Sequence, residues 1–285
     1  MSATDTLIVA RSIAEMRTAI AGWRADGETI GLVPTMGALH EGHLSLVERA
    51  QTLTDRVVAT IFVNPTQFAA NEDLASYPRR EARDFDLLRA AGVPLVFVPP
   101  VEEMYPDGFA TTVTVTGVSE GLCGAHRPGH FAGVATIVTK LLLQALPDVA
   151  VFGEKDYQQL QVIRRLARDL DIPVRIEGAP TVRETDGLAL SSRNAYLDAP
   201  ERERAPVLYR VLTQAASRLT AGDAATTVLA EGIAELERTG FAPVEYLEWR
   251  GADTLAPTPA PGRPTRLLAA AWLGDTRLID NVAVG

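Results

Sequence analysis

Short apolar runs alternate with amphipathic stretches along the first two thirds of the chain. Apolar runs of this length are typical of buried β-strands. They lie at residues 30–33, 56–63, 93–98, 149–152 and 174–176, and an alternating Thr/Val stretch at 111–116 predicts one more strand. Helical patterns separate most of these runs, which predicts an α/β fold: a parallel sheet with helices on both faces.

The helices between these strands have recognisable ends. Ser12, with Glu15 three residues later, forms a capping-box pattern that starts the first helix. Glycine, proline and short polar residues mark the connections. Helices are therefore predicted from about 39 to 54, at 80–91, at 134–146 and from about 157 to 170, and loops at 66–79 and 121–133.

After about Leu197 the pattern changes. Two helical stretches are followed by three strand-like runs, and Gly274-Asp275 reads as a hairpin turn between the last two. Residues 252–265 hold four prolines and predict a surface loop. We therefore expect a first domain at 1–186 and a smaller C-terminal α+β domain at 187–285, with helices at 200–220 and 225–238 and strands at 244–249, 266–272 and 276–284.

Composition narrows the range of partners. A chain of 285 residues with a net charge of −9 lacks the basic excess of a protein that binds nucleic acid or an anionic membrane. Its one cysteine, Cys123, allows no disulfide within the chain, which suits a reducing compartment. Residues 1–10 lack a basic start before an apolar core, so they are not a signal peptide, and no apolar run is long enough for a membrane span. We expect a cytoplasmic protein that acts on small molecules.

The first candidate site follows the 30–33 run, at the carboxyl end of its strand, where parallel sheets bind ligands. A Pro-Thr-Met-Gly turn leads into a helix that carries His40 and His43 near its start. Free backbone N–H groups and the helix dipole attract anions there, and the imidazoles add donors, which predicts a site for nucleotide phosphates. The spacing of Gly37 and Gly42 approaches a P-loop, but His43 and Leu44 replace its Lys and Ser/Thr, so P-loop chemistry is excluded.

Later polar residues complete the candidate site. Lys155 stands at a helix start, where the dipole disfavours a cation unless an anion is near. Ser191, Ser192 and Arg193 can donate several hydrogen bonds to phosphate oxygens, although the local pattern suits a structured turn equally well. Two neutral donor–acceptor side chains that suit a hydroxyl-bearing ligand are Gln67 and Gln159.

A metal site is an alternative for the histidines. All four occur in close pairs, the second being His126 and His130, and imidazole pairs can ligate zinc. The first pair does not match His-Glu-x-x-His sites, in which the histidines are four residues apart, because His40 and His43 are three apart. We therefore favour phosphate binding, and we interpret Cys123 as a packing or inert thiol. Asp84 and Asp86 could be outer-shell carboxylates of the site, but the favoured interpretation is that they are surface helix charges.

Motifs that run in order over nearly the whole chain carry a family resemblance. They are Val33-Pro34-Thr35-Met36-Gly37 with His40-x-Gly42-His43, Phe62-Val63-Asn64-Pro65 with Gln67-Phe68, Tyr77-Pro78-Arg79, Arg127-Pro128-Gly129-His130-Phe131, Phe152-Gly153-Glu154-Lys155-Asp156 with Gln158-Gln159-Leu160, Asp186-Gly187-Leu188-Ala189 with Ser191-Ser192-Arg193-Asn194, and Ala271-Trp272-Leu273-Gly274 with Leu278-Ile279-Asp280-Asn281. On these motifs the chain resembles the pantothenate synthetase (pantoate–β-alanine ligase) family. One departure is Thr66, where the family usually has methionine, but it leaves Gln67 in place.

The resemblance implies a Rossmann-like ATP domain, a smaller domain that closes over it, and a homodimer. The implied reaction converts ATP, pantoate and β-alanine to pantothenate, AMP and diphosphate, with Mg²⁺, through a pantoyl adenylate. The implied catalytic residues are His40, His43 (the proton donor), Lys155, Ser191, Ser192 and Arg193. Pantoate is assigned to Gln67 and Gln159, and ATP to Met36, Gly37, Ala38, Leu39, His40, Glu41, Gly42, His43, Gly153, Glu154, Lys155, Asp156, Val182, Leu190, Ser191, Ser192 and Arg193.

Two other functions remain compatible with part of this pattern. Another nucleotidyltransferase of the same superfamily would share the opening motif but would not need Gln67 together with Gln159. A catalytically dead nucleotide sensor would bind ATP without turnover. Retention of both histidines, Lys155 and the Ser-Ser-Arg run argues against the sensor.

Overall fold

The computed structural model describes residues 7–69, 72–257, 259–260 and 262–285. These residues form two compact units. The first holds the described residues up to 115 together with 127–154 and 162–180, and the second holds 116–126, 155–161 and the described part of 181–285. The second unit thus includes two segments, 116–126 and 155–161, that precede its main part, and the predicted boundary at 186 stays a prediction.

A six-stranded sheet forms the centre of the first unit. Every neighbouring pair of strands is parallel, and their order is β1-β4-β3-β2-β5-β6. The predicted parallel sheet is therefore confirmed. Its strands are β1 (Ile8–Ala10), β2 (Ile30–Thr35), β3 (Arg56–Ile61), β4 (Leu95–Phe97), β5 (Val149–Gly153) and β6 (Arg175–Ala179).

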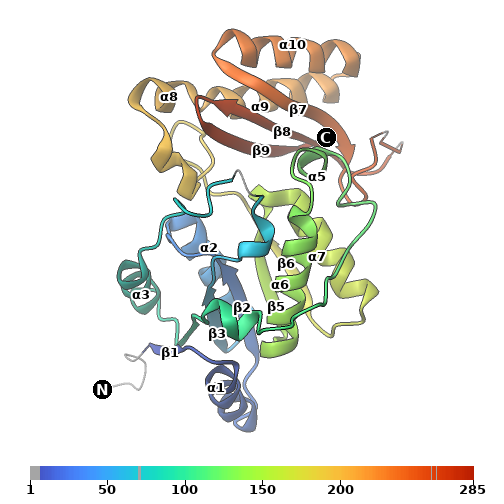
Figure 1. Cartoon of the computed structure of the whole chain (residues 1–285). Helices are drawn as coiled ribbons and strands as arrows, with labels where there is room; N and C mark the ends of the chain where they lie inside the picture. Colours follow the sequence, from blue (N-terminus) through green and yellow to red (C-terminus); the bar gives the residue numbers. More distant parts are fainter. Residues whose placement is uncertain (1–6, 70–71, 258, 261) are drawn as a thin grey trace. The chain divides into compact units, whose positions relative to one another are not determined.

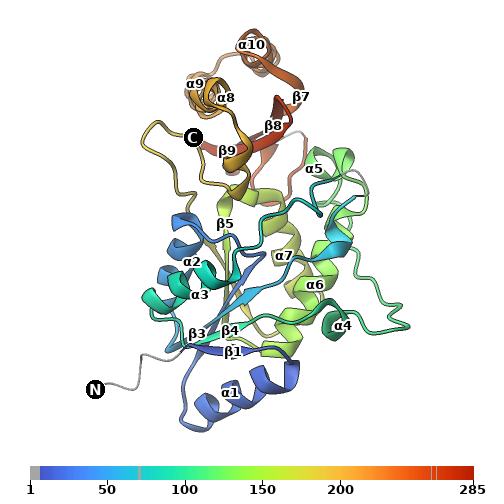
Figure 2. The same ribbon diagram turned by 60° about the vertical axis from the view of Figure 1, so that its left-hand side comes forward.

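Helices cover both faces of this sheet, as predicted. Figure 2 shows α2 and α3 on one side of the strands and α6 and α7 on the other. Ser12 begins α1 with both hydrogen bonds of the capping box, so that prediction is confirmed as well. The helices are α1 (Ile13–Ala25), α2 (Glu41–Gln51), α3 (Glu81–Ala90), α4 (Val101–Met104), α6 (His130–Ala145) and α7 (Tyr157–Asp169), whose first residues belong to the second unit.

The strand order reverses between β2 and β5. From β2 the chain moves outward to β3 and β4, and it later returns to β5 and β6 on the other side. Pairing of β2 with β3 continues to Thr35, but pairing with β5 stops at Leu32. Pro34 has no N–H to donate, so the carboxyl ends of β2 and β5 part there. Ligands of open α/β sheets bind at such a reversal.

The second unit is built on an antiparallel sheet of β7 (Phe241–Gly251), β8 (Thr265–Leu273) and β9 (Thr276–Val284). Figure 1 shows these strands side by side with α9 (Val207–Thr220) and α10 (Ala225–Arg238) against them. Leu273 pairs with Thr276 across the two-residue turn Gly274-Asp275, which confirms the predicted hairpin. No helix among the described residues is long and apolar enough to cross a membrane.

Three local predictions are wrong. Residues 111–116 join neither sheet, and the alternation of their side chains separates exposed from half-buried positions. The predicted loop 121–133 contains the helix α5 (Leu122–His126) and the first turn of α6. The predicted helix 200–220 is divided into α8 (Ala199–Arg204) and α9, because Pro206 cannot donate the backbone hydrogen bond that a continuous helix needs.

The remaining loop predictions fall partly outside the described residues. The described part of 66–79 is irregular after the short helix η1 (Pro65–Gln67), and residues 70 and 71 lie outside the description. The described part of 252–264 is likewise irregular, and residues 258 and 261 lie outside it. Thr265, the last residue of that predicted loop, already belongs to β8.

Candidate active site

A tight left-handed turn connects β2 to α2 at the strand reversal. Gly37 has φ +82° and Ala38 has φ +50°. The amide of Gly37 donates to Oγ1 of Thr35 at 3.2 Å, and that hydroxyl donates to the carbonyl of Thr60 on β3 at 2.6 Å. A side chain at Gly37 would be strained at this φ, which explains the glycine of the motif.

Asp84 of α3 holds the other half of this turn. Its carboxylate accepts hydrogen bonds from the amides of Ala38 at 2.9 Å and Leu39 at 2.8 Å, and the residue is only 1% exposed. Burial raises the pKa of Asp84, while the two amide hydrogen bonds oppose that shift. The surface interpretation is therefore wrong for Asp84. It is right for Asp86, whose side chain is 77% exposed and pairs with Arg89.

The two histidines of the motif are bound to backbone amides through the same ring atom. His40 is the N-cap of α2, and its Nδ1 accepts from the amide of Gly42 at 3.1 Å. The amide of His40 points to Nδ1 of His43 at 3.3 Å, which completes a reciprocal cap. An imidazole nitrogen that accepts a hydrogen bond carries no proton, so this network places the proton of each neutral ring on Nε2.

Several backbone amides at the start of α2 are already hydrogen-bonded within the chain. The sequence pattern predicts free backbone N–H groups for an anion at this helix start, but the amides of Ala38, Leu39 and Gly42 each donate to an acceptor within the chain. An anion at the start of α2 would therefore meet the Nε2–H donors of the histidines and the positive end of the helix dipole. The phosphate site stays a prediction, with the side chains rather than these amides as its donors.

Gln67 lies against the same turn. Its Nε2 is 3.2 Å from Sδ of Met36, and its Oε1 accepts from Nδ2 of Asn64 at 3.0 Å. Asn64 is 1% exposed and also donates to the carbonyl of Gly133 at 3.2 Å. A Cβ at Gly133 would lie 2.3 Å from the carbonyl oxygen of Thr66, so only glycine lets α6 approach η1 this closely. Asn64 thereby holds the side-chain amide of Gln67 in one orientation. Thr66, which stands where the family usually has methionine, leaves Gln67 in place.

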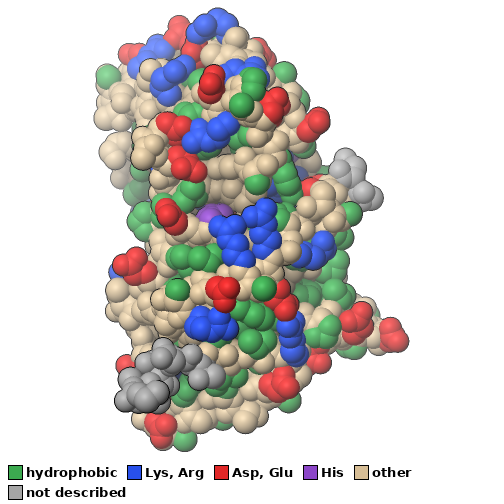
Figure 3. Space-filling view, turned by 90° about the vertical axis from the view of Figure 1, so that its left-hand side faces the viewer, with side chains coloured by type: hydrophobic (Ala, Val, Ile, Leu, Met, Phe, Trp, Pro, Cys, Tyr) green, Lys and Arg blue, Asp and Glu red, His purple; other side chains and the backbone are tan. Residues whose placement is uncertain are grey.

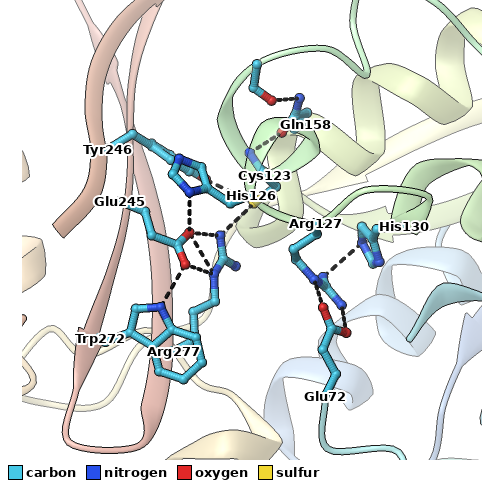
Figure 4. A network of polar contacts seen from close by, with 11 residues as sticks. Glu72, Cys123, His126, Arg127, His130, Gln158, Glu245, Tyr246, Trp272 and Arg277 are labelled. Carbon is cyan, nitrogen blue, oxygen red and sulfur yellow. Dashed lines mark hydrogen bonds and ion pairs between the residues drawn. The ribbon is translucent and has the colours of Figure 1, made fainter. Parts of the chain in front are cut away.

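His130 supports Gln67 through its backbone. Nε2 of His130 lies 3.0 Å from Nη1 of Arg127, which can only donate, so Nδ1–H donates to the carbonyl of Gln67 at 2.9 Å. Arg127 also forms a two-pronged ion pair with Glu72 (Figure 4). Burial alone would raise the pKa of Glu72, but Arg127 outweighs it and holds the pKa below its ordinary value.

These roles bear on the metal alternative. Both ring nitrogens of His130 are engaged by the chain itself. In the part of the chain that the structure describes, no group of three or more His, Cys, Asp or Glu side chains is arranged to hold a metal ion. Of the second histidine pair, His130 supports Gln67, whereas His126 lies 3.9 Å from Glu245.

Lys155 belongs to the second unit, on the short helix η2 (Glu154–Asp156) that precedes α7. Its carbonyl accepts a hydrogen bond from Nδ2 of Asn281 on β9 at 2.9 Å. The guanidinium of Arg266 on β8 stacks over the ring of Tyr157 at 3.8 Å. The C-terminal sheet thus holds the segment that carries both Lys155 and Gln159.

Gln158 ties the same segment to the loop before α5. Its Oε1 accepts from the amide of Cys123 at 3.0 Å, and its Nε2 donates to the carbonyls of Val118 at 3.1 Å and Gly121 at 3.2 Å. Cys123 is buried, and its Sγ lies 3.0 Å from the hydroxyl of Tyr246 (Figure 4), which agrees with a packing thiol. These hydrogen bonds hold Gln158 inward at the start of α7, where Gln159 follows it.

The polar loop of the motif Ser191-Ser192-Arg193 is also a defined structure in the second unit. It forms the short helix η3 (Ser192–Tyr196), with Oγ of Ser191 accepting from the amide of Arg193 at 3.2 Å. The amide of Leu190 donates to the carbonyl of Val182 at 3.0 Å, so these two predicted ATP contacts are adjacent. Further back, Arg183 forms a two-pronged ion pair with the buried Asp280.

The predicted site residues therefore fall into two groups. The first unit holds the residues from Met36 to His43 together with Gln67, Gly153 and Glu154, and the second holds Lys155, Asp156, Gln159, Val182 and the residues from Leu190 to Arg193. Within each unit the contacts above bring several members together.

Acidic and uncharged side chains interrupt the basic ones over the face in Figure 3, where histidine reaches the surface. This fits a small-molecule site better than a nucleic-acid surface.

Comparison with known proteins decides which family these features represent. A family model described as pantoate–β-alanine ligase matches residues 8–283. The chain belongs to the pantoate–β-alanine ligase family. The pantothenate synthetase of Paramagnetospirillum magneticum is 62% identical over 97% of each chain, and that of Rhodospirillum rubrum is 59% identical over 98% of this chain and 99% of its own.

Solved structures of the family agree with the fold. The pantothenate synthetase of Thermus thermophilus matches with a TM-score of 0.91 and 48% identity, covering 96% of this chain and 98% of its own. A pantoate–β-alanine ligase of Francisella tularensis, solved in complex with β,γ-ATP and β-alanine, matches with a TM-score of 0.82 and 34% identity over 98% of both chains. The activity of the family, ATP-dependent ligation of pantoate to β-alanine to form pantothenate, is the activity of this chain.

Proposed function

We propose that the chain makes pantothenate in two steps at the site described above. In the first, a carboxylate oxygen of pantoate attacks the α-phosphorus of ATP, and diphosphate leaves. In the second, the amine of β-alanine attacks the acyl carbon of the pantoyl adenylate, AMP leaves and the amine loses a proton. The observation that carries this proposal is the paired histidine turn at the strand reversal, where two imidazoles are held with Nε2 as the donor.

The first step calls for hydrogen-bond donors more than for covalent chemistry. Negative charge grows on the departing diphosphate, and fixed donors that meet this charge lower the barrier. His43 is proposed as the proton donor, because its Nδ1 is the acceptor of the reciprocal cap and its proton is therefore on Nε2. The other proposed donors to phosphate are His40, Lys155, Ser191, Ser192 and Arg193.

The acid substrate is assigned to the two glutamines. Gln67 is 8% exposed, and its amide lies beside Met36 of the ATP turn, which places a neutral donor–acceptor next to the proposed phosphate site. An amide can bind both a hydroxyl and a carboxylate oxygen without adding charge. Gln159 is proposed as its partner for pantoate, with the remaining residues of 36–43, 153–156, 182 and 190–193 contacting ATP.

Magnesium is proposed to enter with ATP. Mg²⁺ in such sites is held by one or two carboxylates and by substrate phosphates rather than by a protein cage. The residues fit this mode: the described chain has no cluster of three metal ligands, whereas Asp156 beside Lys155 has a carboxylate that is 48% exposed. Asp156 would contact the ion, which would neutralise phosphate charge when bound.

Two broader proposals rest on the family resemblance and the composition. We propose that the enzyme is a homodimer and that it works in the cytoplasm, where a chain with a single cysteine stays reduced. Sedimentation of the purified protein measures the first of these directly.

Isotope exchange tests the two-step order. Wild-type protein incubated with ATP, pantoate and labelled diphosphate, without β-alanine, should return label to ATP, because the first step is complete and reversible before the amine arrives. Omission of pantoate is the control and should abolish the exchange. Exchange that requires β-alanine would contradict a free-standing adenylate.

A further inference from the structure

We propose that Asp84 is a positioning residue for adenylate formation: it fixes the turn at residues 37–39 so that His40 and His43 meet the phosphates of ATP. The inference rests on the proposed function of the histidine turn. It adds a residue to the site that lies on a different helix and touches no substrate itself.

The geometry of Asp84 is that of a two-point clamp. Each of its carboxylate oxygens accepts one of two successive amides, Oδ2 from Ala38 and Oδ1 from Leu39. The residue is 1% exposed on α3, and burying a carboxylate is unfavourable unless its hydrogen bonds compensate. A side chain that spans two neighbouring amides restricts both their positions and their directions.

The clamped backbone is one that the chain would not adopt by default. Ala38 has φ +50°, a left-handed conformation that residues with a Cβ rarely adopt. A Cβ at Gly37 would lie 3.1 Å from Oδ2 of Asp84 and 3.0 Å from Cγ2 of Ile61 on β3. The turn therefore fits closely between α3 and β3. Surroundings must hold a conformation of this kind, and Asp84 supplies the hydrogen bonds that do so.

The turn that Asp84 holds is directly followed by the two histidines. Leu39, whose amide Asp84 binds, precedes His40, the N-cap of α2. The amide of His40 in turn points to Nδ1 of His43. A displaced turn would therefore move one imidazole through the chain and the other through the reciprocal cap. Displacements of about 1 Å in a catalytic group can cost roughly 10²-fold in rate.

Asp84 acts through the turn rather than on substrate. A carboxylate that touched the phosphates would oppose their binding, because like charges repel at short range. Both oxygens of Asp84 instead face the backbone amides that lead to the cap. Loss of these two hydrogen bonds should therefore lower kcat/KM for ATP and leave kcat/KM for β-alanine unchanged.

The test is the variant Asp84→Asn. Asparagine keeps the size of the side chain but replaces one acceptor with an NH₂ group, which cannot accept from an amide. We expect kcat/KM for ATP to fall by roughly tenfold to hundredfold, with kcat/KM for β-alanine unchanged. The matched control is Asp86→Asn, an exposed residue of the same helix, which should leave all constants at wild-type values.

A purely structural role predicts a different result. If Asp84 only supported folding, Asp84→Asn would lower kcat/KM for ATP and for β-alanine by the same factor, with both KM values unchanged. That result, or a wild-type kcat/KM for ATP, would overturn the proposal. Diphosphate exchange by the wild-type protein keeps this outcome distinct from a failure of the proposed function itself.

A second variant covers the case in which Asp84→Asn does not fold. Gly37→Ala disturbs the same hydrogen bonds from the turn itself, because its new Cβ would crowd Oδ2 of Asp84. It should show the same signature, a reduced kcat/KM for ATP with an unchanged kcat/KM for β-alanine. A Gly37→Ala protein with wild-type use of ATP would show that the turn tolerates displacement, and the proposal would fail.

Discussion

Replacement of Lys155 by alanine is expected to lower pantoate-dependent ATP–diphosphate exchange by roughly 10²-fold or more, as loss of one preorganised charge-stabilising group does. The lysine stands at a helix start, where the dipole disfavours a cation unless an anion is near, and the carboxylate of Asp156 lies 3.9 Å from its ammonium. Its backbone is fixed by Asn281 and its side chain is 21% exposed, so the ammonium is held near its place before ATP arrives. The measurement is the exchange rate at saturating ATP and pantoate.

The chain offers a matched control for this experiment, because it contains only two lysines. Lys140 lies on α6 with its ammonium 4.8 Å from the ring centre of Phe109, and it belongs to no proposed contact with substrate. Lys140→Ala should keep exchange near the wild-type rate. Near wild-type exchange in Lys155→Ala would remove the lysine from the proposed site.

The second large effect is expected for His43→Ala, again a loss of roughly 10²-fold or more in exchange. This change removes the proposed Nε2–H donor and also the acceptor that caps the amide of His40. His43→Asn separates the two roles, because its amide oxygen can still accept at the Nδ1 position while the donor is lost. The asparagine variant should therefore bind ATP better than the alanine variant but exchange diphosphate equally slowly.

His126 is the control for the second prediction. Its side chain is 38% exposed and lies 3.9 Å from Glu245, and it is not among the proposed phosphate contacts. His126→Ala should exchange diphosphate at nearly the wild-type rate. If His43→Ala did the same, the assignment of His43 as proton donor would be wrong.

Much of the fold could be predicted because its signals are local. The central strands are continuous apolar runs, the capping box of α1 spans four residues, and the Gly274-Asp275 turn is adjacent to both strands that it joins. The failures occur where the local pattern lacks the deciding information. Residues 111–116 have the composition of a strand, but a strand needs a partner that alternation cannot reveal, and β1 (Ile8–Ala10) is too short to show a period.

The candidate site divides in the same way. His40, His43 and Lys155 could be found from the sequence because glycine turns and helix starts mark anion sites within a few residues. Their supports could not, since each comes from far along the chain. Asp84 lies 45 residues beyond Leu39, and Asn281 lies 126 residues beyond Lys155. Two acids spaced like Asp84 and Asp86 look alike until the packing of α3 turns one of them inward.

The most direct test of the account follows an oxygen atom through the reaction. Pantoate labelled with ¹⁸O in both carboxylate oxygens is converted with ATP and β-alanine, and the products are analysed by mass spectrometry. Attack on the α-phosphorus, followed by attack of the amine on the acyl carbon, predicts AMP with one ¹⁸O and pantothenate with the other. Unlabelled AMP, or label in inorganic phosphate or diphosphate, would contradict an adenylate formed at this site.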